Sequence, residues 1–465
     1  MKANVRSKEP ADAAIDRKTA DRYRLAQGLM SGVNLCVVGG GFVGVVSAAG
    51  FVEFGHSVVC VEKDSERLAM LREGRLPFYE RDLEELVRRG IQSDRLSFTD
   101  DLAGAVKGQR AIFVTVGTPA KDSGRTDLGP LEEVVRVLAE TAEPGQVVVL
   151  KSTVPVGTGR RVRERLSGGG NGREPKAVIN NPEFLREGSA VHDFFHPQRI
   201  VIGGEDPKAV ECVAHLYRLG MTSPVPIVQT NNETAEMIKY ASNAFIALKV
   251  GFINELAGLC DLLGTNVLEV AHAMGMDPRI GAEYLVPGPG WGGSCLGKDL
   301  KELEGLAESK DYSPLIIRAV QQANLRHQER IVARIRGLTG TLYQARIGVL
   351  GLAFKAGTSD MRDSPSIPII EGLLAEGASV VAYDPQAHAE ARRYLPKLEL
   401  AASAALAANK ADCLVILTEW QEFQSLDFKA IAGQMRRPIL LDARNLLVPE
   451  SMQRYGFTYA SMGQA

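Results

Sequence analysis

The amino-acid sequence predicts an α/β fold in which two doubly wound parallel sheets are joined by a helical domain with a long central helix. Two observations support this prediction. Short apolar runs rich in β-branched residues alternate with longer helical stretches near both ends of the chain, which is typical of parallel sheets covered by helices. Between these regions, residues 233–263 contain no proline, and their pattern predicts one long helix that ends near Gly264.

Chain length and the change in character along the sequence predict the domain boundaries. A chain of 465 residues is too long for one core, since domains usually have about 100–200 residues. We expect a polar N-terminal extension at 1–32, a first α/β domain at 33–228, a helical central domain at 229–336 and a second α/β domain at 337–465.

Continuous apolar runs mark the predicted strands, because strands buried on both faces of a sheet lack polar alternation. In the first α/β domain these runs are VNLCVVG, SVVCVE, AIFVTVG and QVVVLKS, at 33–39, 57–62, 111–117 and 146–152. In the second they are RIGVLGLAF, SVVAYDP, DCLVILTEW and PILLDARN, at 346–354, 379–385, 412–420 and 438–445. Amphipathic stretches such as 66–74 and 83–90 are predicted to be covering helices.

Charge and hydropathy patterning argue against two classes of partner. The formal net charge is -2 and no long basic run occurs, so we expect neither a nucleic acid nor an anionic membrane surface as partner. Residues 1–32 contain no apolar segment of the kind that signal peptides carry, and no uninterrupted apolar run reaches the ~18 residues of a membrane span. We therefore expect a cytoplasmic protein.

The six cysteines are predicted to have different roles. No CxxC pair is present, so neither a disulfide framework nor a zinc site is expected, and the seven histidines form no ligand cluster in the sequence. Five cysteines lie in apolar strand-like or helix-like runs and are expected to be small core residues: Cys36, Cys60, Cys212, Cys260 and Cys413. Only Cys295 lies in a polar, glycine-rich segment.

The segment from Val38 to Gly44 predicts a dinucleotide site. It has the form G-x-G-x-x-G, follows the first strand and opens a helix with Phe42 and Val43, which is the context of the Rossmann fingerprint. Gly39 allows a tight turn, Gly41 lets the backbone approach a pyrophosphate, and Gly44 lets the helix pack closely on the strand. The diphosphate is expected at the helix N-terminus, where free N–H groups favour anions.

An acidic residue at the end of the second strand predicts which dinucleotide binds. Glu62 lies about twenty residues after the glycine motif, where a carboxylate hydrogen-bonds the ribose 2′-hydroxyl and repels a 2′-phosphate. We therefore expect NAD rather than NADP. Asp64 is an alternative candidate for this role.

The glycine-rich segment at 289–299 predicts a reactive cysteine. Ser294 is the predicted N-cap residue, with a helix that begins at Cys295. A cysteine at a helix N-terminus has a lowered pKa and more of the nucleophilic thiolate. Asp299 would lie one turn further on the same face. The alternative interpretation is a buried cysteine beside an ordinary cap.

The long predicted helix carries a second candidate pair. Lys239 and Asn243 share one helix face at a spacing of four residues. A solvated lysine with a polar neighbour is the commoner arrangement for such a pair. The surrounding helix is largely apolar, however, which favours a covered and functional face.

A third candidate segment is 180–188. Asn181 is predicted to cap a helix with Pro182 at its first position, so that Glu183 and Glu187 lie one turn apart. Two acids in a first turn could also simply complement the helix dipole. The segments 151–155 and 116–119 follow predicted strands, and strand-end loops bind ligands in sheets of this kind.

Taken together, these segments resemble the UDP-glucose/GDP-mannose dehydrogenase family over about residues 33–448. The most specific motifs are GWGGSCLGKD, ETAEMIKYASNAF, NPEFLREGSA, KSTVPVGT, FKAGTSDMRDSP and LTEWQEF. The segment MDPRIG at 276–281 is most similar to members that act on UDP-glucose. The resemblance implies two Rossmann-like domains, the second of which holds the uridine diphosphate, and a homodimer formed largely by the long central helix.

The resemblance also implies a reaction, the four-electron oxidation of UDP-glucose to UDP-glucuronate with two NAD consumed. Cys295 would capture the intermediate aldehyde as a thiohemiacetal, which is oxidised to a thioester and released by water. Asp299, Thr153 and Glu183 match positions that activate water and handle protons. Lys239 and Asn243 match positions that stabilise the developing oxyanion, in agreement with their shared helix face.

Further residues match family positions that contact the two ligands. With the glycine motif, the expected cofactor-binding residues are Gly39, Gly41, Phe42, Val43, Gly44, Glu62, Arg67, Thr118, Thr153, Glu187 and Arg362. The expected substrate-binding residues are Glu183, Phe184, Leu185, Glu187, Lys239, Asn243, Arg279, Tyr284, Gly292, Lys355 and Arg444. Arg279 matches an arginine that reaches the substrate across a dimer interface.

The sequence departs from the family pattern at two places. Leu296-Gly297 replaces the usual Phe-Pro after the cysteine, and a glycine there weakens the first helical turn by about 1 kcal/mol. The segment 286–289 is unusually rich in proline. Three alternatives therefore stay open: the same chemistry on GDP-mannose or a UDP-N-acetylhexosamine, a two-electron β-hydroxyacid dehydrogenase, and a non-catalytic nucleotide-sugar-binding protein. The second does not need Cys295 or a second α/β domain, and the third predicts loss of Cys295, Lys239 or Asp299, all of which are present.

Overall fold

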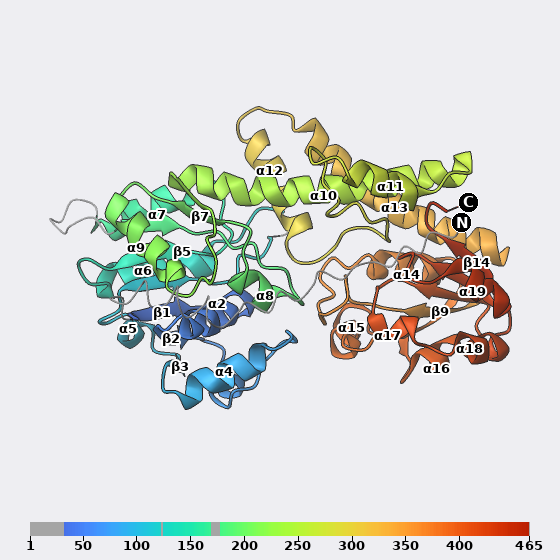
Figure 1. The fold of residues 1–465 in the computed structure, drawn as a ribbon, viewed down its shortest axis with the longest axis horizontal. Coiled ribbons are helices and arrows are strands. Elements are labelled where there is room, and N and C mark those ends of the chain that lie inside the picture. Colours follow the sequence, from blue (N-terminus) through green and yellow to red (C-terminus); the bar gives the residue numbers. More distant parts are fainter. Residues whose placement is uncertain (1–31, 122–123, 169–176, 465) are drawn as a thin grey trace.

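The chain folds into two α/β regions that lie side by side beneath one long helix (Figure 1). A computed structural model describes residues 32–121, 124–168 and 177–464. The predicted fold class, two parallel-sheet regions with a helical segment between them, is confirmed. The predicted N-terminal extension at 1–32 lies outside the described residues except for Gly32.

The first sheet has the strand order β3-β2-β1-β4-β5-β6-β7-β8. Its strands are β1 (Asn34–Val38), β2 (Ser57–Val61), β3 (Leu96–Thr99), β4 (Ala111–Val114), β5 (Val147–Leu150), β6 (Ala177–Asn180), β7 (Ile200–Gly203) and β8 (Ile227–Thr230). Its helices are α2 (Phe42–Glu53), α3 (Ser65–Arg72), α4 (Leu83–Gln92), α5 (Leu102–Ala105), α6 (Gly129–Thr141), α7 (Thr158–Leu166), α8 (Ala190–Phe195) and α9 (Pro207–Arg218). Neighbouring strands are parallel except β6 and β7.

The central strands β1, β4 and β5 of the first sheet are buried on both faces, as their continuous apolar runs predict. Leu35 and Val37 of β1 belong to the core cluster on one face, with helices α2, α8 and α9. Cys36 and Val38 belong to the cluster on the other face, with α6 and α7. The sheet is therefore covered by helices on both faces, and its carboxyl edge is where ligands bind in sheets of this kind.

The second sheet has the order β11-β10-β9-β12-β13-β14, and its paired strands are all parallel. Its strands are β9 (Arg346–Leu350), β10 (Ser379–Tyr383), β11 (Glu399–Leu400), β12 (Cys413–Ile416), β13 (Ile439–Asp442) and β14 (Thr458–Ser461). Its helices are α14 (Ser366–Ala375), α15 (His388–Tyr394), α16 (Ala404–Ala408), α17 (Gln421–Gln424), α18 (Phe428–Gln434) and α19 (Pro449–Arg454).

The long helix α10 (Asn232–Leu263) spans both regions, as Figure 1 shows. Asn231 caps its start by accepting a hydrogen bond from the N–H of Thr234, and Gly264 ends it in the left-handed conformation with φ 67°. The prediction of one helix that ends near Gly264 is confirmed. Helices α11 (Val267–Gly275), α12 (Leu296–Glu308) and α13 (Leu315–Thr339) complete the helical segment, and α12 and α13 both pack on α10.

Two local helix predictions are wrong. Asn181 caps no helix, because residues 181–187 form an irregular segment and the amide of Asn181 is occupied by Val201 and Lys151 instead. The second concerns the start of α12. The helix begins at Leu296, and Cys295 itself is the N-cap residue without a side-chain cap bond, because the hydroxyl of Ser294 lies 3.5 Å from the Cys295 sulfur.

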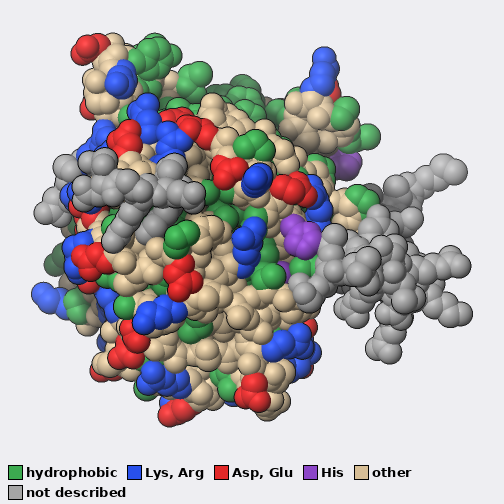
Figure 2. Space-filling model, turned by 90° about the vertical axis from the view of Figure 1, so that its left-hand side faces the viewer, with side chains coloured by type: hydrophobic (Ala, Val, Ile, Leu, Met, Phe, Trp, Pro, Cys, Tyr) green, Lys and Arg blue, Asp and Glu red, His purple; other side chains and the backbone are tan. Residues whose placement is uncertain are grey.

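Cysteines and surface charges are distributed largely as the sequence indicates. Cys36, Cys60, Cys260 and Cys413 are buried, and Cys212 is partly buried. On the face drawn in Figure 2, acidic and basic side chains are interspersed. Within the described residues, none of the helices combines the length and apolar composition needed to span a membrane, and no three potential metal ligands are grouped.

Candidate functional site

Two buried polar pairs lie one turn apart on α10. The Lys239 Nζ donates to Glu183 Oε1 at 2.8 Å, and both side chains are buried. The Asn243 Nδ2 donates to Asp299 Oδ2 at 2.6 Å, and the second oxygen of Asp299 accepts from Lys298 Nζ at 2.7 Å. The structure thus unites residues from the 181–187 segment, α10 and α12. Their predicted shared face on the long helix is confirmed.

The Glu183–Lys239 pair is ionised. Burial opposes the charge on both groups, but each stabilises the other, so the pKa of Glu183 is lowered and that of Lys239 is raised. Cys295 and Asp299 also lie within the electrostatic reach of Lys239. A buried ammonium close to a thiol and two carboxylates is the arrangement expected of a site that handles protons.

Cys295 stands at the start of α12, exposed to solvent although protein atoms surround most of its thiol. Burial raises the pKa of the thiol, and the positive charge of Lys239 lowers it. The net shift is upward, so the prediction of a lowered thiol pKa is wrong. Proximity to Glu183 and Asp299 contributes to the rise, because like charges disfavour a thiolate.

The ends of β4 and β5 form the adjoining wall. The Thr118 hydroxyl donates to the carbonyl of Thr153 at 2.8 Å, and the Ser152 hydroxyl donates to the carbonyl of Val116 at 2.7 Å. The two strand-end loops predicted from the sequence are therefore bonded to each other. Both lie at the carboxyl edge of the sheet, where parallel sheets bind ligands.

The glycine loop after β1 has the geometry of a dinucleotide site. Gly39 has a φ of 115°, and a Cβ on Gly44 would lie 1.8 Å from the carbonyl oxygen of Gly39, so both positions require glycine. A Cβ on Gly41 would meet no atom within 4 Å, which leaves space for a phosphate beside it. Helix α2 starts at Phe42 without a side-chain cap, and its first N–H groups remain available to an anion.

Glu62, and not Asp64, faces this loop. The Glu62 side chain is buried, with Oε2 2.9 Å from the Cβ that Gly40 would carry, and Oε1 accepts the N–H of Asp64 at 2.8 Å. The Asp64 carboxylate caps α3 by accepting the N–H of Arg67 at 2.9 Å. The residues around the loop therefore fit NAD, and the alternative acid has a structural role. The Arg67 side chain itself is exposed.

The segment before Cys295 is fastened to the long helices. Asn254 on α10 accepts the N–H of Gly288 at 2.8 Å, and His327 Nε2 on α13 lies 2.7 Å from the carbonyl oxygen of the same residue. Asn324 bonds both the N–H and the carbonyl of Trp291, at 3.0 and 3.2 Å. These amide and imidazole contacts fix the backbone that leads to the thiol.

The second α/β region meets the site through its first loop. The Thr358 hydroxyl and the Arg362 guanidinium donate to Glu187 at 3.2 and 3.3 Å. A Cβ on Gly188 would lie 2.8 Å from the carbonyl oxygen of Gly357, so the backbones touch here. Burial and repulsion by Asp360 raise the pKa of Glu187 to about 7, against the stabilising charge of Arg362.

Lys355 and Arg444 lie at the same junction. Burial lowers the pKa of Lys355, whose facing charges include Glu187 and Glu419. Arg444 donates to the carbonyls of Leu417 and Phe354 at 2.8 and 2.9 Å and lies beside Gly288. Arg444 thus connects the second α/β region with the segment that leads to Cys295.

Phe184 and Leu185 contact this cluster directly, and Tyr284 has an unusual backbone conformation. Phe184 lies between two cations, with the Arg199 guanidinium 3.9 Å and the Lys239 nitrogen 5.4 Å from its ring centre. The Leu185 N–H donates to Glu183 Oε2 at 2.6 Å. Tyr284 has a φ of 66°, a strained conformation of the kind often found at functional sites.

Two further placements complete the predicted set. A Cβ on Gly292 would lie 2.4 Å from the carbonyl oxygen of Asp363, so this glycine permits the second region to approach. Arg279 is exposed and pairs with Asp277 at 2.5 Å. Its loop is tied to α10 by Lys249, which donates to the carbonyl of Gly281 at 2.9 Å. The structure does not bring Arg279 to the site within this chain.

Several residues of the site were not foreseen. Lys151, Tyr217 and His327 are buried and bonded within the cluster or its supports. Lys151 belongs to a segment that the sequence indicates as a strand-end loop, but no separate role was assigned to it. The sequence around Tyr217 and His327 does not mark them as site residues, because each is one polar position on an ordinary amphipathic helix.

Comparison with known proteins agrees with this site. Three models of the UDP-glucose/GDP-mannose dehydrogenase family match: its NAD binding domain at 33–220, its central domain at 233–326 and its UDP binding domain at 348–449. UDP-glucose 6-dehydrogenase of Rhizobium meliloti is 42% identical over 93% of this chain and 100% of its own length. The Pseudomonas aeruginosa enzyme of the same name is 41% identical over 93% and 98%.

A solved structure gives the same result. The UDP-glucose dehydrogenase of Pyrobaculum islandicum superposes with a TM-score of 0.86 at 35% identity, covering 93% of this chain and 98% of that one. With the glycine loop, the buried acid and the matched NAD binding domain in place, the cofactor is NAD. The chain thus belongs to the UDP-glucose/GDP-mannose dehydrogenase family and is an NAD-dependent nucleotide-sugar dehydrogenase.

Proposed function

We propose that this chain oxidises UDP-glucose to UDP-glucuronate in two successive NAD-dependent steps, with Cys295 as the covalent nucleophile. The observation that carries the proposal is the meeting of Cys295 with the Glu183–Lys239 and Asn243–Asp299 pairs. The Rhizobium meliloti and Pseudomonas aeruginosa relatives are both named UDP-glucose 6-dehydrogenase, which supports UDP-glucose as the sugar.

The chain's own residues hold the cofactor at the carboxyl edge of the first sheet. The N–H groups at the start of α2 receive the diphosphate beside Gly41, and Glu62 binds the ribose. Thr118 and Thr153 line the next strand-end loop. When bound there, NAD supplies the hydride acceptor for both oxidations.

The protein groups divide the remaining chemistry. In the first oxidation, a base near the sugar C6 hydroxyl removes its proton, a role that fits a water held by Asp299. The Cys295 sulfur then adds to the aldehyde carbon and forms a thiohemiacetal. Loss of a second hydride from that carbon gives a thioester, and attack by water releases the carboxylate and restores the thiol.

Helix α10 supplies the side chains that stabilise the negative charge developing on the substrate oxygen. The Lys239 ammonium and the Asn243 amide are preorganised donors, held one turn apart by their bonds to Glu183 and Asp299. Such donors stabilise the oxyanion that develops in each tetrahedral intermediate. Glu183, Asp299 and Thr153 are the groups that orient or deprotonate the hydrolytic water.

The nucleotide binds against the second α/β region. Lys355 and Arg444 lie where this region meets the segment before Cys295, and both are cationic groups suited to a diphosphate. Glu187 and Arg362 join the two regions at the same place, where they would contact the cofactor or the substrate. This assignment agrees with the position of the matched UDP binding domain.

The chain forms a homodimer through α10. Phe245, Phe252 and Leu259 recur at intervals of seven residues and are 60%, 45% and 47% exposed, which gives the helix an uncovered apolar stripe. A second copy of the helix would bury it, and Arg279, tied beside α10 by Lys249, would then face the partner. Phe252→Glu should convert the dimer to a monomer in light scattering, whereas an unchanged mass would exclude this interface.

The substitution Cys295→Ser tests the covalent mechanism. Because a serine ester cannot replace the thioester efficiently, the variant should bind NAD and UDP-glucose normally but lose steady-state turnover by a factor of at least about 10³. Cys212→Ser, which alters a partly buried cysteine of α9, is the matched control and should keep wild-type turnover. Full turnover by Cys295→Ser would overturn the mechanism.

The choice of sugar is tested by comparing kcat/KM for UDP-glucose with that for GDP-mannose and UDP-N-acetylglucosamine. We expect a preference for UDP-glucose of at least about 100-fold, because polar groups that lose their partner on a wrong sugar are costly. A clear preference for either of the other sugars would keep the chemistry and reassign the substrate. Binding of all three without NAD reduction would indicate a non-catalytic protein.

A further inference from the structure

A second buried lysine lies behind the Glu183–Lys239 pair. Lys151 follows β5 directly and is 4% exposed. Its Nζ donates to Asn181 Oδ1 at 3.2 Å and to the Tyr217 hydroxyl at 3.0 Å. A buried ammonium is costly unless it is hydrogen-bonded and close to a negative charge, so its presence calls for a reason.

Asn181 connects this lysine to the segment that carries Glu183. Its Oδ1 also accepts the Tyr217 hydroxyl at 2.6 Å, its Nδ2 donates to the carbonyl of Val201 at 2.9 Å, and its N–H donates to the carbonyl of Leu150 at 2.9 Å. The residue is therefore fixed by side chain and backbone together. Glu183 follows two residues later in an irregular segment that has no helix of its own to hold it.

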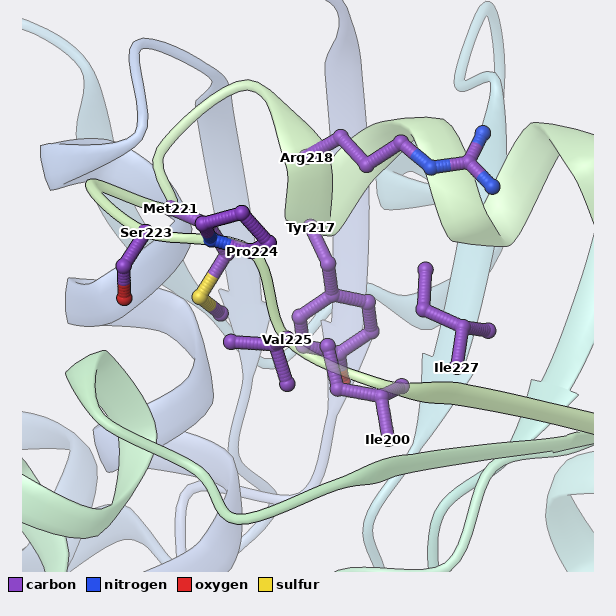
Figure 3. Close-up of a pocket in the computed structure, with 8 residues that line it drawn as sticks. All are labelled: Ile200, Tyr217, Arg218, Met221, Ser223, Pro224, Val225 and Ile227. Atoms are coloured by element: carbon purple, nitrogen blue, oxygen red, sulfur yellow. The ribbon is translucent and has the colours of Figure 1, made fainter.

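Tyr217 closes the network from the outer side. Its ring lines a pocket of about 240 Å³ together with Ile200, Met221, Val225 and Ile227 (Figure 3). The ring also packs on Phe51 and Phe194, with ring centres 5.3 and 6.2 Å apart, so packing and the hydroxyl bonds to Asn181 and Lys151 fix Tyr217 together. The network thus spans from a surface hollow to the residues around Glu183.

We propose that Lys151 is a positioning residue for the oxidation: through Asn181 and Tyr217 it holds the Glu183 segment in place, and its charge adds to that of Lys239 in stabilising the Glu183 carboxylate. The proposal rests on the proton-handling role given to Glu183 in the proposed function. It adds a residue outside the set that contacts the sugar or the cofactor.

The electrostatics agree with this geometry. Burial raises the pKa of Glu183, and three groups together lower it further than burial raises it: Lys239 from α10 most, then the N–H of Leu185, and least of the three Lys151 from the end of β5. The Cys295 thiol faces the same carboxylate from α12. Burial lowers the pKa of Lys151 to about 8, with Glu183 opposing the shift, so Lys151 is largely charged at neutral pH.

Removal of the Lys151 charge tests the proposal through the pH profile of kcat/KM. Lys151→Gln retains an amide donor for Asn181 and Tyr217 but loses the charge, and Lys151→Met loses both. In each variant the Glu183 carboxylate is less stabilised, so the acidic limb of the profile should move to higher pH by about one unit. At pH values below the Glu183 pKa this lowers kcat/KM by up to about tenfold, whereas at about pH 7 the profiles of variant and wild type should coincide and KM for NAD should change little.

Two controls separate this effect from general damage. Lys208→Met removes an exposed lysine on α9 and should leave the profile unchanged. Tyr217→Phe removes a hydrogen bond but no charge, so it should lower kcat modestly without moving the acidic limb. If Lys151→Met does not fold, Lys151→Gln still decides the question.

The outcomes distinguish this inference from the proposed function. An active wild type whose acidic limb coincides with that of Lys151→Gln would overturn the inference alone. A wild type that fails to reduce NAD with any of the three sugars would overturn the proposed function and this inference with it. A shift equal in Lys151→Gln and Tyr217→Phe would show that only the hydrogen bonds matter, which contradicts the role of the charge.

Discussion

The two α/β regions begin in the same way and then diverge. β1 and β9 are each followed by a glycine with positive φ, 115° at Gly39 and 96° at Gly351. Each glycine donates its N–H to the last residue of the neighbouring strand, Val61 or Tyr383, at 2.8 Å. Up to this turn, the same local rules shape both sheets.

The difference lies in the acid that follows the second strand of each sheet. Asp384 is buried and accepts the N–H groups of Leu352 and Ala353 at 2.7 and 3.0 Å, and it also bonds Gln386, Ala387 and Trp420. Glu62 accepts the N–H of Asp64 and faces the glycine loop. Five groups of its own region donate to Asp384, whereas Glu62 accepts one backbone N–H and its second oxygen faces the glycine loop.

The loop after each glycine explains this difference. After β1, helix α2 begins at Phe42, so its N–H groups point from the strand end. After β9, residues 351–365 intervene before α14, and this longer loop fills the space above Asp384. The first region therefore fits a dinucleotide at its strand end, and the second uses its loop to reach the other region.

The largest expected effect comes from Gly44→Ala. The added Cβ would lie 1.8 Å from the Gly39 carbonyl oxygen and 2.7 Å from Thr115 Oγ1, which forces α2 away from β1. We expect a loss of NAD affinity of at least about 100-fold in calorimetry, with UDP binding by the second region retained. Gly433→Ala in α18, where a Cβ meets no atom within 4 Å, should change neither. Equal loss of both ligands would mean that the regions are not independent.

Helix α13, which leads into the second α/β region, carries the buried His327. Burial lowers the pKa of His327 to about 4 in the folded chain. In the unfolded chain the imidazole has its ordinary pKa of about 6.5, so between these pH values only the unfolded chain is protonated at His327. The stability contribution of the neutral imidazole is complete above pH 6.5 and is lost as the pH falls toward 4, by up to about 3 kcal/mol.

His327→Gln is the variant that measures this contribution. The difference in free energy of unfolding between wild type and His327→Gln, followed by urea denaturation from pH 7 to pH 4, should change by that amount. Parallel curves for the two proteins would refute the assignment of a buried, neutral imidazole at Gly288.

Substitutions of Glu62 and Asp384 should have different effects on cofactor choice. Glu62→Ala removes a hydrogen bond to the ribose and a negative charge, so the ratio of kcat/KM for NAD over NADP should fall by about tenfold or more. Asp384→Asn should leave this ratio unchanged and lower the melting temperature instead, because Asp384 bonds its own backbone. A wild type that uses both cofactors equally well would contradict the role of Glu62.

The smallest effect is expected at Gly297. A Cβ there would lie 3.0 Å from Asp363 Oδ2 and 3.4 Å from the Trp291 ring, so Gly297→Ala needs only a small movement of one exposed carboxylate. The gain in helix propensity, about 1 kcal/mol, offsets this contact. We expect kcat/KM within about twofold of wild type. A fall of tenfold or more would show that the Leu296-Gly297 departure tunes catalysis.

Features set by local pattern were predictable from the sequence. The apolar runs predicted the central strands of both sheets, and the absence of proline from 233–263 predicted α10. Helical periodicity alone placed Lys239 and Asn243 on one face. The glycine motif predicted a tight turn at Gly39 and close packing at Gly44, since both follow from backbone geometry.

Features set by long-range contacts were not predictable. The Lys151–Asn181–Tyr217 network joins residues 30 and 66 positions apart, and it withdraws the Asn181 amide from the predicted cap. The thiol pKa of Cys295 follows the balance between burial and Lys239, which a helix-terminus argument omits. The role of Asp384 likewise depends on how the loop at 351–365 folds back on it.

A four-electron oxidation at one site fixes how much NADH each sugar molecule yields. NADH is measured by absorbance after complete conversion of a limiting, known amount of UDP-glucose with excess NAD. The thioester route through Cys295 predicts two NADH for each UDP-glucose consumed. One NADH for each UDP-glucose, with an aldehyde accumulating, would exclude the four-electron oxidation.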